Sequence, residues 1–94
     1  MSRLDWASVL VSITLPAYDE VGSLERVVDE ALAALAEIGS GEVLIVDDGS
    51  RDGTARLADS LAARHAGVRA VHHERNRGFS GAMSTCFRQA RGDW

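Results

Sequence analysis

One continuous apolar run constrains the fold of this chain more than any other feature. Residues 42–47 read EVLIVD, and the four positions between the two acids are all apolar. A half-buried strand alternates polar and apolar residues, whereas a strand covered on both faces is apolar at every position. The sheet that contains this strand therefore needs helices on both of its faces.

Strand-like and helix-like segments alternate along the rest of the chain. Three segments rich in β-branched and apolar residues are predicted as strands: Ser8–Leu15, 42–47 and 68–73. Three segments with apolar residues at helical spacing follow them: 22–39, 53–66 and 80–92. Pro16 has no backbone N–H, so it is predicted to end the first strand. The order βαβαβα predicts a three-layer α/β fold with a parallel sheet and right-handed crossovers.

Capping residues and apolar faces define the predicted helices further. Ser23 and Thr54 are candidate N-caps, and Gly39 and Gly92 are candidate C-terminal stops. The third helix is predicted to turn four side chains toward the sheet: Met83, Cys86, Phe87 and Ala90.

Length and composition limit the class of protein. Ninety-four residues support one small domain, and three strands make a thin sheet, so we expect residues 1–94 to be the first half of a larger domain. Cys86 is the only cysteine, which excludes an internal disulfide and fits the cytoplasm. No apolar run approaches the length of a membrane span, so membrane association is expected only through segments outside this sequence. The net charge of -4 argues against nucleic-acid binding.

Polar residues follow each predicted strand. Ligands of open parallel sheets bind beyond the carboxyl ends of the strands. There, Asp47 and Asp48 could accept hydrogen bonds from a base or a ribose, Gly49 would allow a sharp turn, and Tyr18 offers a face for stacking. On the residues alone, an Asx-turn with a helix cap explains the aspartate pair equally well.

The segment after the third predicted strand, ERNRGFSG, holds Arg75 and Arg77 close to the start of a helix. That position suits a phosphate group, although a plain turn accounts for it nearly as well. His72 and His73 have no ligand partner at a metal-binding spacing, so no metal site is predicted in this chain.

Four stretches together resemble the N-terminal, nucleotide-binding half of the family 2 glycosyltransferases, which have the GT-A fold. The stretches are VSITLPAYDE, EVLIVDDGSRDGT, ERNRGFSGA and ARGDW, in the order and at the spacing of that family. Within the family, the polyprenyl-phosphate sugar transferases of the dolichyl-phosphate mannose synthase type are the most similar.

The resemblance implies a role for individual residues. Pro16, Ala17 and Tyr18 would line the nucleotide base, with Tyr18 against its ring. Glu20 would lie near the base or ribose, Asp48 would accept a hydrogen bond from the base, and Asp47 would support the Gly49 turn or the ribose. Arg75 and Gly78 would border the sugar diphosphate. The implied nucleotide-binding residues are Pro16, Ala17, Tyr18, Glu20, Asp47, Asp48, Gly49, Arg75 and Gly78.

The chain also departs from the family pattern. Asp19 stands where asparagine is commoner, Phe79 where the polyprenyl group often has lysine, and Cys86 where many members have a small residue. The family's metal-binding Asp-x-Asp and its catalytic base follow the ARGDW segment and are absent. A divalent cation, Mg²⁺ or Mn²⁺, is therefore expected in a full-length enzyme with ligands outside this chain, and no transfer activity is expected from these residues alone.

The predicted function is binding of a UDP- or GDP-sugar as part of a glycosyltransferase whose acceptor could be a polyprenyl phosphate. Because the family's metal-bearing strand would pair beside Ser8–Leu15, this strand is expected to present a free edge through which copies associate. Two other classes stay open. One is a receiver-like signalling domain that binds Mg²⁺, although its acids would follow the first strand and no lysine is present. The other is a non-catalytic assembly module.

Overall fold

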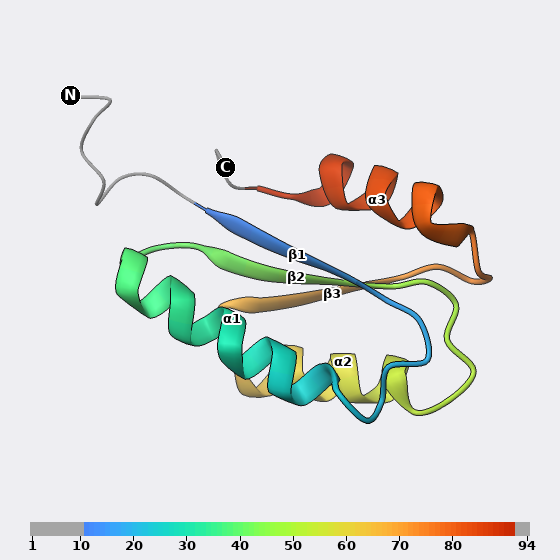
Figure 1. Ribbon diagram of the computed structural model, residues 1–94, viewed down its shortest axis with the longest axis horizontal. Helices are drawn as coiled ribbons and strands as arrows, with labels where there is room; N and C mark the ends of the chain where they lie inside the picture. The colour runs from blue at the N-terminus through green and yellow to red at the C-terminus, as the bar shows by residue number, and fades with distance from the viewer. Residues whose placement is uncertain (1–10, 92–94) are drawn as a thin grey trace.

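The computed structural model describes residues 11–91, which form a parallel sheet with helices on both faces (Figure 1). The elements are β1 Ser12–Ala17, α1 Leu24–Ile38, β2 Glu42–Asp47, α2 Thr54–Arg64, β3 Val68–His72 and α3 Gly78–Gln89. The strands lie in the order β1-β2-β3 and both pairings are parallel. The predicted βαβαβα order and three-layer α/β class are therefore confirmed.

Strand β2 is the centre of the core, as its apolar run predicts. All six of its residues are buried. Val43 and Ile45 pack in the cluster formed with α1 and α2, whereas Leu44 and Val46 pack against Cys86 of α3 on the other face. Successive side chains of a strand point to opposite faces, so this one segment supplies both halves of the core.

The prediction that Pro16 ends the first strand is wrong, because β1 continues through Pro16 to Ala17. The carbonyls of Val11 and Ala17 accept hydrogen bonds from the amides of Glu42, the first residue of β2, and Asp48, which follows β2, so the odd-numbered residues of β1 face β2. Pro16 points its nitrogen to the outer edge, where proline costs no ladder bond. Of the predicted segment Ser8–Leu15, residues 8–10 lie outside the described residues.

Helix α3 covers the second face of the sheet with small side chains. Ala82, Thr85 and Cys86 are its buried residues, whereas Phe87 is 78% exposed. The prediction that Phe87 faces the sheet is therefore wrong, because the helix packs closely along a row of small residues. The helix ends at Gln89, and Gly92 lies outside the described residues.

The observed helix caps agree only in part with those predicted from the sequence. Gly39 ends α1 in the left-handed conformation, with φ of 101°, as predicted. Ser23 stands at the N-cap of α1, but its side chain makes no capping bond and donates instead to the carboxylate of Glu20. Thr54 is the first residue of α2 rather than its cap, which is Gly53.

At the amino-terminal end of the sheet, a buried carboxylate joins three elements. Glu42 accepts hydrogen bonds from Arg69 Nε of β3 at 2.8 Å, from Ser12 Oγ of β1 at 2.6 Å and from the Arg91 amide after α3 at 2.7 Å. Burial raises the pKa of Glu42, but these donors outweigh it and lower the pKa to about 2. The ionised carboxylate therefore fastens the end of α3 to the sheet.

Candidate functional site

The three loops that leave the carboxyl ends of the strands meet at one end of the molecule (Figure 1). They connect β1 to α1, β2 to α2 and β3 to α3. Ala17, Asp47 and His72 are the last residues of the strands, and Ala17 and His72 each lie beside Asp47 in the ladder. Residues distant in sequence therefore converge where ligands of parallel sheets bind.

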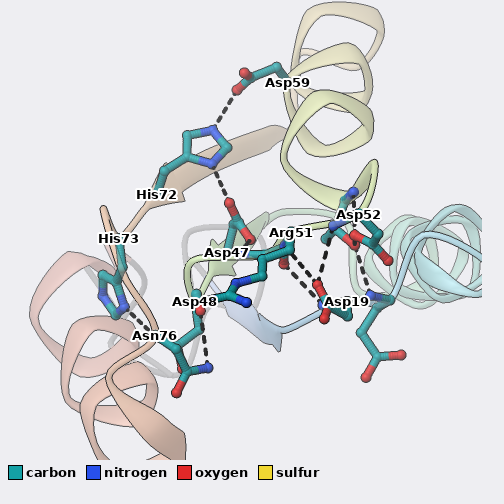
Figure 2. A network of polar contacts seen from close by, with 12 residues as sticks. Asp19, Asp47, Asp48, Arg51, Asp52, Asp59, His72, His73 and Asn76 are labelled. Carbon is teal, nitrogen blue, oxygen red and sulfur yellow. Dashed lines mark hydrogen bonds and ion pairs between the residues drawn. The ribbon is translucent and has the colours of Figure 1, made fainter.

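The adjacent carboxylates of Asp47, the last residue of β2, and Asp48, the first residue of the β2–α2 loop, point to opposite faces of the sheet. Asp47 contacts His72, which also contacts Asp59 of α2, whereas Asp48 contacts His73, which also contacts Thr85 of α3. Figure 2 shows the two aspartate–histidine pairs on separate sides. Two carboxylates so divided cannot both ligate one ion, which argues against the receiver-like alternative.

Asp47 holds the loop in place on the side of α2. Its Oδ1 accepts from the Ser50 amide at 3.1 Å, and its Oδ2 lies 2.9 Å from His72 Nδ1. His72 Nε2 lies 2.7 Å from Asp59 Oδ1. Partial burial lowers the pKa of His72, but the two carboxylates outweigh it and raise the pKa. The His72 ring thus bridges β2 to α2 through its contacts with Asp47 and Asp59.

Asp48 is buried on the side of α3 and is well supplied with donors. Its Oδ1 lies 2.7 Å from His73 Nδ1 and accepts from the Arg77 amide at 2.8 Å. Its backbone carbonyl accepts from Asn76 Nδ2 at 3.2 Å. Burial raises the pKa of Asp48, but the hydrogen bonds from His73 and Arg77 outweigh it, so the pKa is lowered. Asp48 is therefore a fixed anion, ready to accept a hydrogen bond.

Asp19 ties the β1–α1 loop to the β2–α2 loop (Figure 2). Its Oδ1 accepts from the amides of Arg51 at 2.8 Å and Asp52 at 3.4 Å, and its own amide donates to Ser50 Oγ at 3.0 Å. Asp19 has φ of 52°, in the left-handed region that asparagine and aspartate tolerate best among non-glycine residues. Aspartate is therefore compatible with the left-handed backbone at this position.

Asp52 and Thr54 make a second connection between the same two loops. Asp52 accepts from the Thr54 amide at 2.8 Å, as expected of helix-start chemistry, and also from the Val21 amide at 3.3 Å. Thr54 is fully buried, and its Oγ1 accepts from the Glu20 amide at 2.8 Å. These residues therefore do more than begin α2, because they also position the loop that carries Tyr18.

Gly49 allows the β2–α2 and β3–α3 loops to touch. Its φ is 71°, and a Cβ at this position would lie less than 3.0 Å from the backbone of both Arg75 and Asn76. Real Cβ atoms do not approach backbone so closely, so only glycine fits without displacing the neighbouring loop. The predicted sharp turn is present, and its second reason is this close approach.

Two cavities lie between these loops, and every one of the nine predicted nucleotide-binding residues lines one of them. The Asp48 cavity, of about 290 Å³, is lined by Pro16, Ala17, Tyr18, Glu20, Asp48 and Gly78, among others. The Arg75 cavity, of about 460 Å³, is lined by Tyr18, Asp47, Gly49 and Arg75, among others. Tyr18 and Asn76 border both cavities, so the two adjoin. The nine residues predicted from the sequence therefore lie close together in the folded chain.

Sequence reasoning missed the supporting residues of this site. His72 and His73 have no ligand partner in the sequence, but the parallel register brings them beside Asp47 and Asp48. A polar pair at the ends of two neighbouring strands was the signal that could have found them. Asn76 was missed as well, and it donates to the Asp48 carbonyl while accepting from the Gly78 amide at 3.0 Å.

Within residues 11–91, no group of three or more histidine, cysteine, aspartate or glutamate side chains is arranged to hold a metal ion. The carboxylates at the strand ends are already engaged with histidines and backbone amides. The described residues therefore do not fit a divalent cation. In the same part of the chain, no helix has the length and apolar character needed to span a membrane.

Comparison with known proteins agrees with this geometry. The family described as Glycosyl transferase family 2 matches residues 12–94. That range covers both cavities and all three strands, so the chain belongs to glycosyl transferase family 2.

Three relatives indicate the branch of the family to which the chain is similar. It is 39% identical over 90 residues to Glycosyltransferase AglD of Haloferax volcanii, covering 93% of this chain and 14% of the relative. It is 42% identical over 86 residues to Undecaprenyl-phosphate 4-deoxy-4-formamido-L-arabinose transferase of Pseudomonas aeruginosa, covering 89% of this chain and 25% of the relative. It is 35% identical over 96 residues to Dolichyl-phosphate beta-glucosyltransferase of Drosophila melanogaster, covering 94% of this chain and 29% of the relative. Two of these relatives are thus named as transferases of undecaprenyl phosphate or dolichyl phosphate, and the chain spans less than a third of the length of each of the three relatives.

Proposed function

We propose that this chain is the nucleotide-sugar-binding portion of a glycosyltransferase that transfers sugar from a UDP- or GDP-sugar to an acceptor, with a polyprenyl phosphate as the acceptor. The observation that carries the proposal is the gathering of all nine predicted residues around the two adjoining cavities, in a chain of glycosyl transferase family 2. The acceptor class is supported by the names of two relatives, which include undecaprenyl phosphate and dolichyl phosphate.

The two cavities suit different parts of the donor. The Asp48 cavity has apolar walls from Pro16, Ala17 and Phe79 beside one buried carboxylate, which suits a base that stacks and donates one hydrogen bond. The Arg75 cavity has Arg51 and Arg75 in its lining, and these two guanidinium groups can pair with a diphosphate, although Asp47, Asp59 and Glu74 line the same cavity. Tyr18 lies between them and can stack against the base.

Catalysis belongs to groups beyond residues 11–91 in this proposal. A divalent cation that neutralises the diphosphate leaving group would be held by ligands outside this part of the chain. The 94-residue chain then binds the donor without transferring the sugar. We assign the reaction to the cytoplasm at the inner face of the membrane, which suits the single reduced Cys86 and a lipid-linked acceptor.

Removal of the Asp48 carboxylate is expected to weaken nucleotide binding at least tenfold, because a buried charged hydrogen bond contributes about 1.5–3 kcal/mol. Calorimetric titration of UDP and GDP into the wild type, Asp48→Ala and Asp48→Asn measures this. Asp29→Ala removes an exposed carboxylate of α1 and is the matched control, with binding unchanged. A folded wild type that binds neither nucleotide would refute the proposal and favour an assembly module.

We also propose that the 94-residue chain self-associates through the outer edge of β1. Among residues 11–91, β1 pairs only with β2, and its even-numbered positions point outward. An open edge promotes pairing with another copy, although Pro16 shortens the usable stretch because it has no donor. Light scattering over a concentration series is expected to show a rising average mass. A constant monomer mass would contradict this prediction.

A further inference from the structure

A chain of directional hydrogen bonds connects the surface of α3 to the Asp48 carboxylate. Arg88 Nη2 donates to Thr85 Oγ1 at 3.0 Å, Thr85 Oγ1 lies 2.7 Å from His73 Nε2, and His73 Nδ1 lies 2.7 Å from Asp48 Oδ1. His73 is buried, with 7% of its surface exposed. Because an ionised carboxylate only accepts, Nδ1 carries the proton and donates. In the neutral ring, Nε2 then accepts from the Thr85 hydroxyl.

Two hydrogen bonds, one from His73 and one from the Arg77 amide, saturate one oxygen of Asp48. Oδ1 accepts from His73 Nδ1 at 2.7 Å and from the Arg77 amide at 2.8 Å, which uses both of its lone-pair directions. The same two bonds prevent the carboxylate from rotating. The Gly78 amide also lies near this carboxylate and lowers its pKa, but its hydrogen bond goes to Asn76 Oδ1. Asp48 therefore presents at most one oxygen, Oδ2, to a ligand in the Asp48 cavity.

We infer that His73 is a positioning residue that makes Asp48 a single hydrogen-bond acceptor and thereby selects a uracil base over guanine. This inference rests on the proposed function. Uracil offers one N–H, at N3 between two carbonyl groups, and one carboxylate oxygen matches it. Guanine offers N1–H and the N2 amino group side by side, which pair best with both oxygens of a carboxylate. At this site one of the two guanine donors would be buried without a partner, at a loss of affinity.

Other bases fit the single acceptor less well than uracil. Cytosine presents an unprotonated ring nitrogen at N3, which faces the carboxylate as a second acceptor. The single acceptor therefore favours uracil over cytosine as well as over guanine.

Titration of UDP, GDP and CDP into the wild type and His73 variants tests the inference. The wild type is expected to bind UDP at least tenfold more tightly than GDP. In His73→Leu, Oδ1 of Asp48 keeps only the Arg77 amide as a donor, so the carboxylate is held less firmly and the ratio should fall below about threefold. His73→Asn keeps an N–H close to the Nδ1 position and should restore most of the preference. His65→Asn, a histidine substitution beside the start of β3, is the matched control and should leave the ratio unchanged.

A second readout reports on Asp48 without any nucleotide. The carboxyl ¹³C resonance of Asp48, followed by NMR against pH, should titrate at a higher pH in His73→Leu than in the wild type, because the donor that lowers the pKa is gone. If His73→Leu is unfolded by circular dichroism, Thr85→Val replaces it in both experiments. That variant removes the donor to Nε2 and should reduce the preference for UDP more weakly.

The outcomes separate this inference from the function on which it rests. Binding that Asp48→Ala abolishes, together with a UDP-to-GDP ratio that His73→Leu leaves unchanged, would overturn the role of His73 alone. A wild type that prefers GDP would do the same. No nucleotide binding by a folded wild type would overturn the proposed function and the inference together.

Discussion

Gly49→Ala is expected to reduce the free energy of unfolding by about 3 kcal/mol. A left-handed φ of 71° costs an alanine about 1–2 kcal/mol, and the new Cβ would also lie less than 3.0 Å from the backbone of Arg75 and Asn76. The β3–α3 loop must move to relieve this contact. In a chain of this size, the melting temperature should fall by more than about 10 °C, as measured by circular dichroism.

Two other glycines separate the causes of this effect. Gly78 has φ of 79°, but an added Cβ there would meet nothing within 4 Å, so Gly78→Ala carries only the conformational cost of about 1 kcal/mol. Gly22 has open space around it and no left-handed φ, so Gly22→Ala should change stability by less than about 0.5 kcal/mol. If Gly49→Ala were no more destabilising than Gly78→Ala, the close approach of the two loops would be refuted.

Glu42→Gln is expected to destabilise the chain by about 3 kcal/mol at pH 7 and to flatten its acid denaturation. The pKa of Glu42 is about 2 in the folded chain against an ordinary value of 4.5. A lowered pKa contributes stability that is fully present above pH 4.5 and is lost as the pH falls toward 2. The substitution also leaves the half-buried Arg69 without its anionic partner.

Urea denaturation at a series of pH values between 7 and 2 measures both effects. The wild type should lose more stability than Glu42→Gln across the window from pH 4.5 to 2, because only the wild type has this carboxylate to protonate. Glu30→Gln, which breaks an exposed pair with Arg26, is the control and should cost under about 0.5 kcal/mol. Parallel pH profiles for Glu42→Gln and the wild type would contradict this account of Glu42.

The architecture could be predicted because it depends on patterns along the chain. The continuous apolar run of β2 required helices on both faces, and the alternation of segments then gave the order of elements. The end of β1 could not be predicted, because the tolerance for Pro16 depends on which edge its nitrogen faces. The exposure of Phe87 was missed for a related reason, since small residues bring α3 close to the sheet along a different row.

The residues that line the site could be predicted from the sequence, but the hydrogen bonds that hold them in position could not. Asp47 and Asp48 stand next to each other in the sequence and look equivalent, yet alternation along the strand sends them to opposite faces with different histidines. The connection of Asp19 to the β2–α2 loop joins residues more than 30 positions apart. Such contacts follow from strand register and loop geometry, which no local pattern encodes.

The measurement that tests the central claim most directly is an NMR titration of the ¹⁵N-labelled chain with UDP. If the three loops form the donor site, amide shifts should concentrate in residues 17–20, 47–51 and 73–78, around the two cavities. The amides of Glu42 and Arg69, at the opposite end of the sheet, should not move. Shifts centred on that opposite end, or none at millimolar concentrations of either UDP or GDP, would contradict the assignment of a nucleotide-sugar site to these loops.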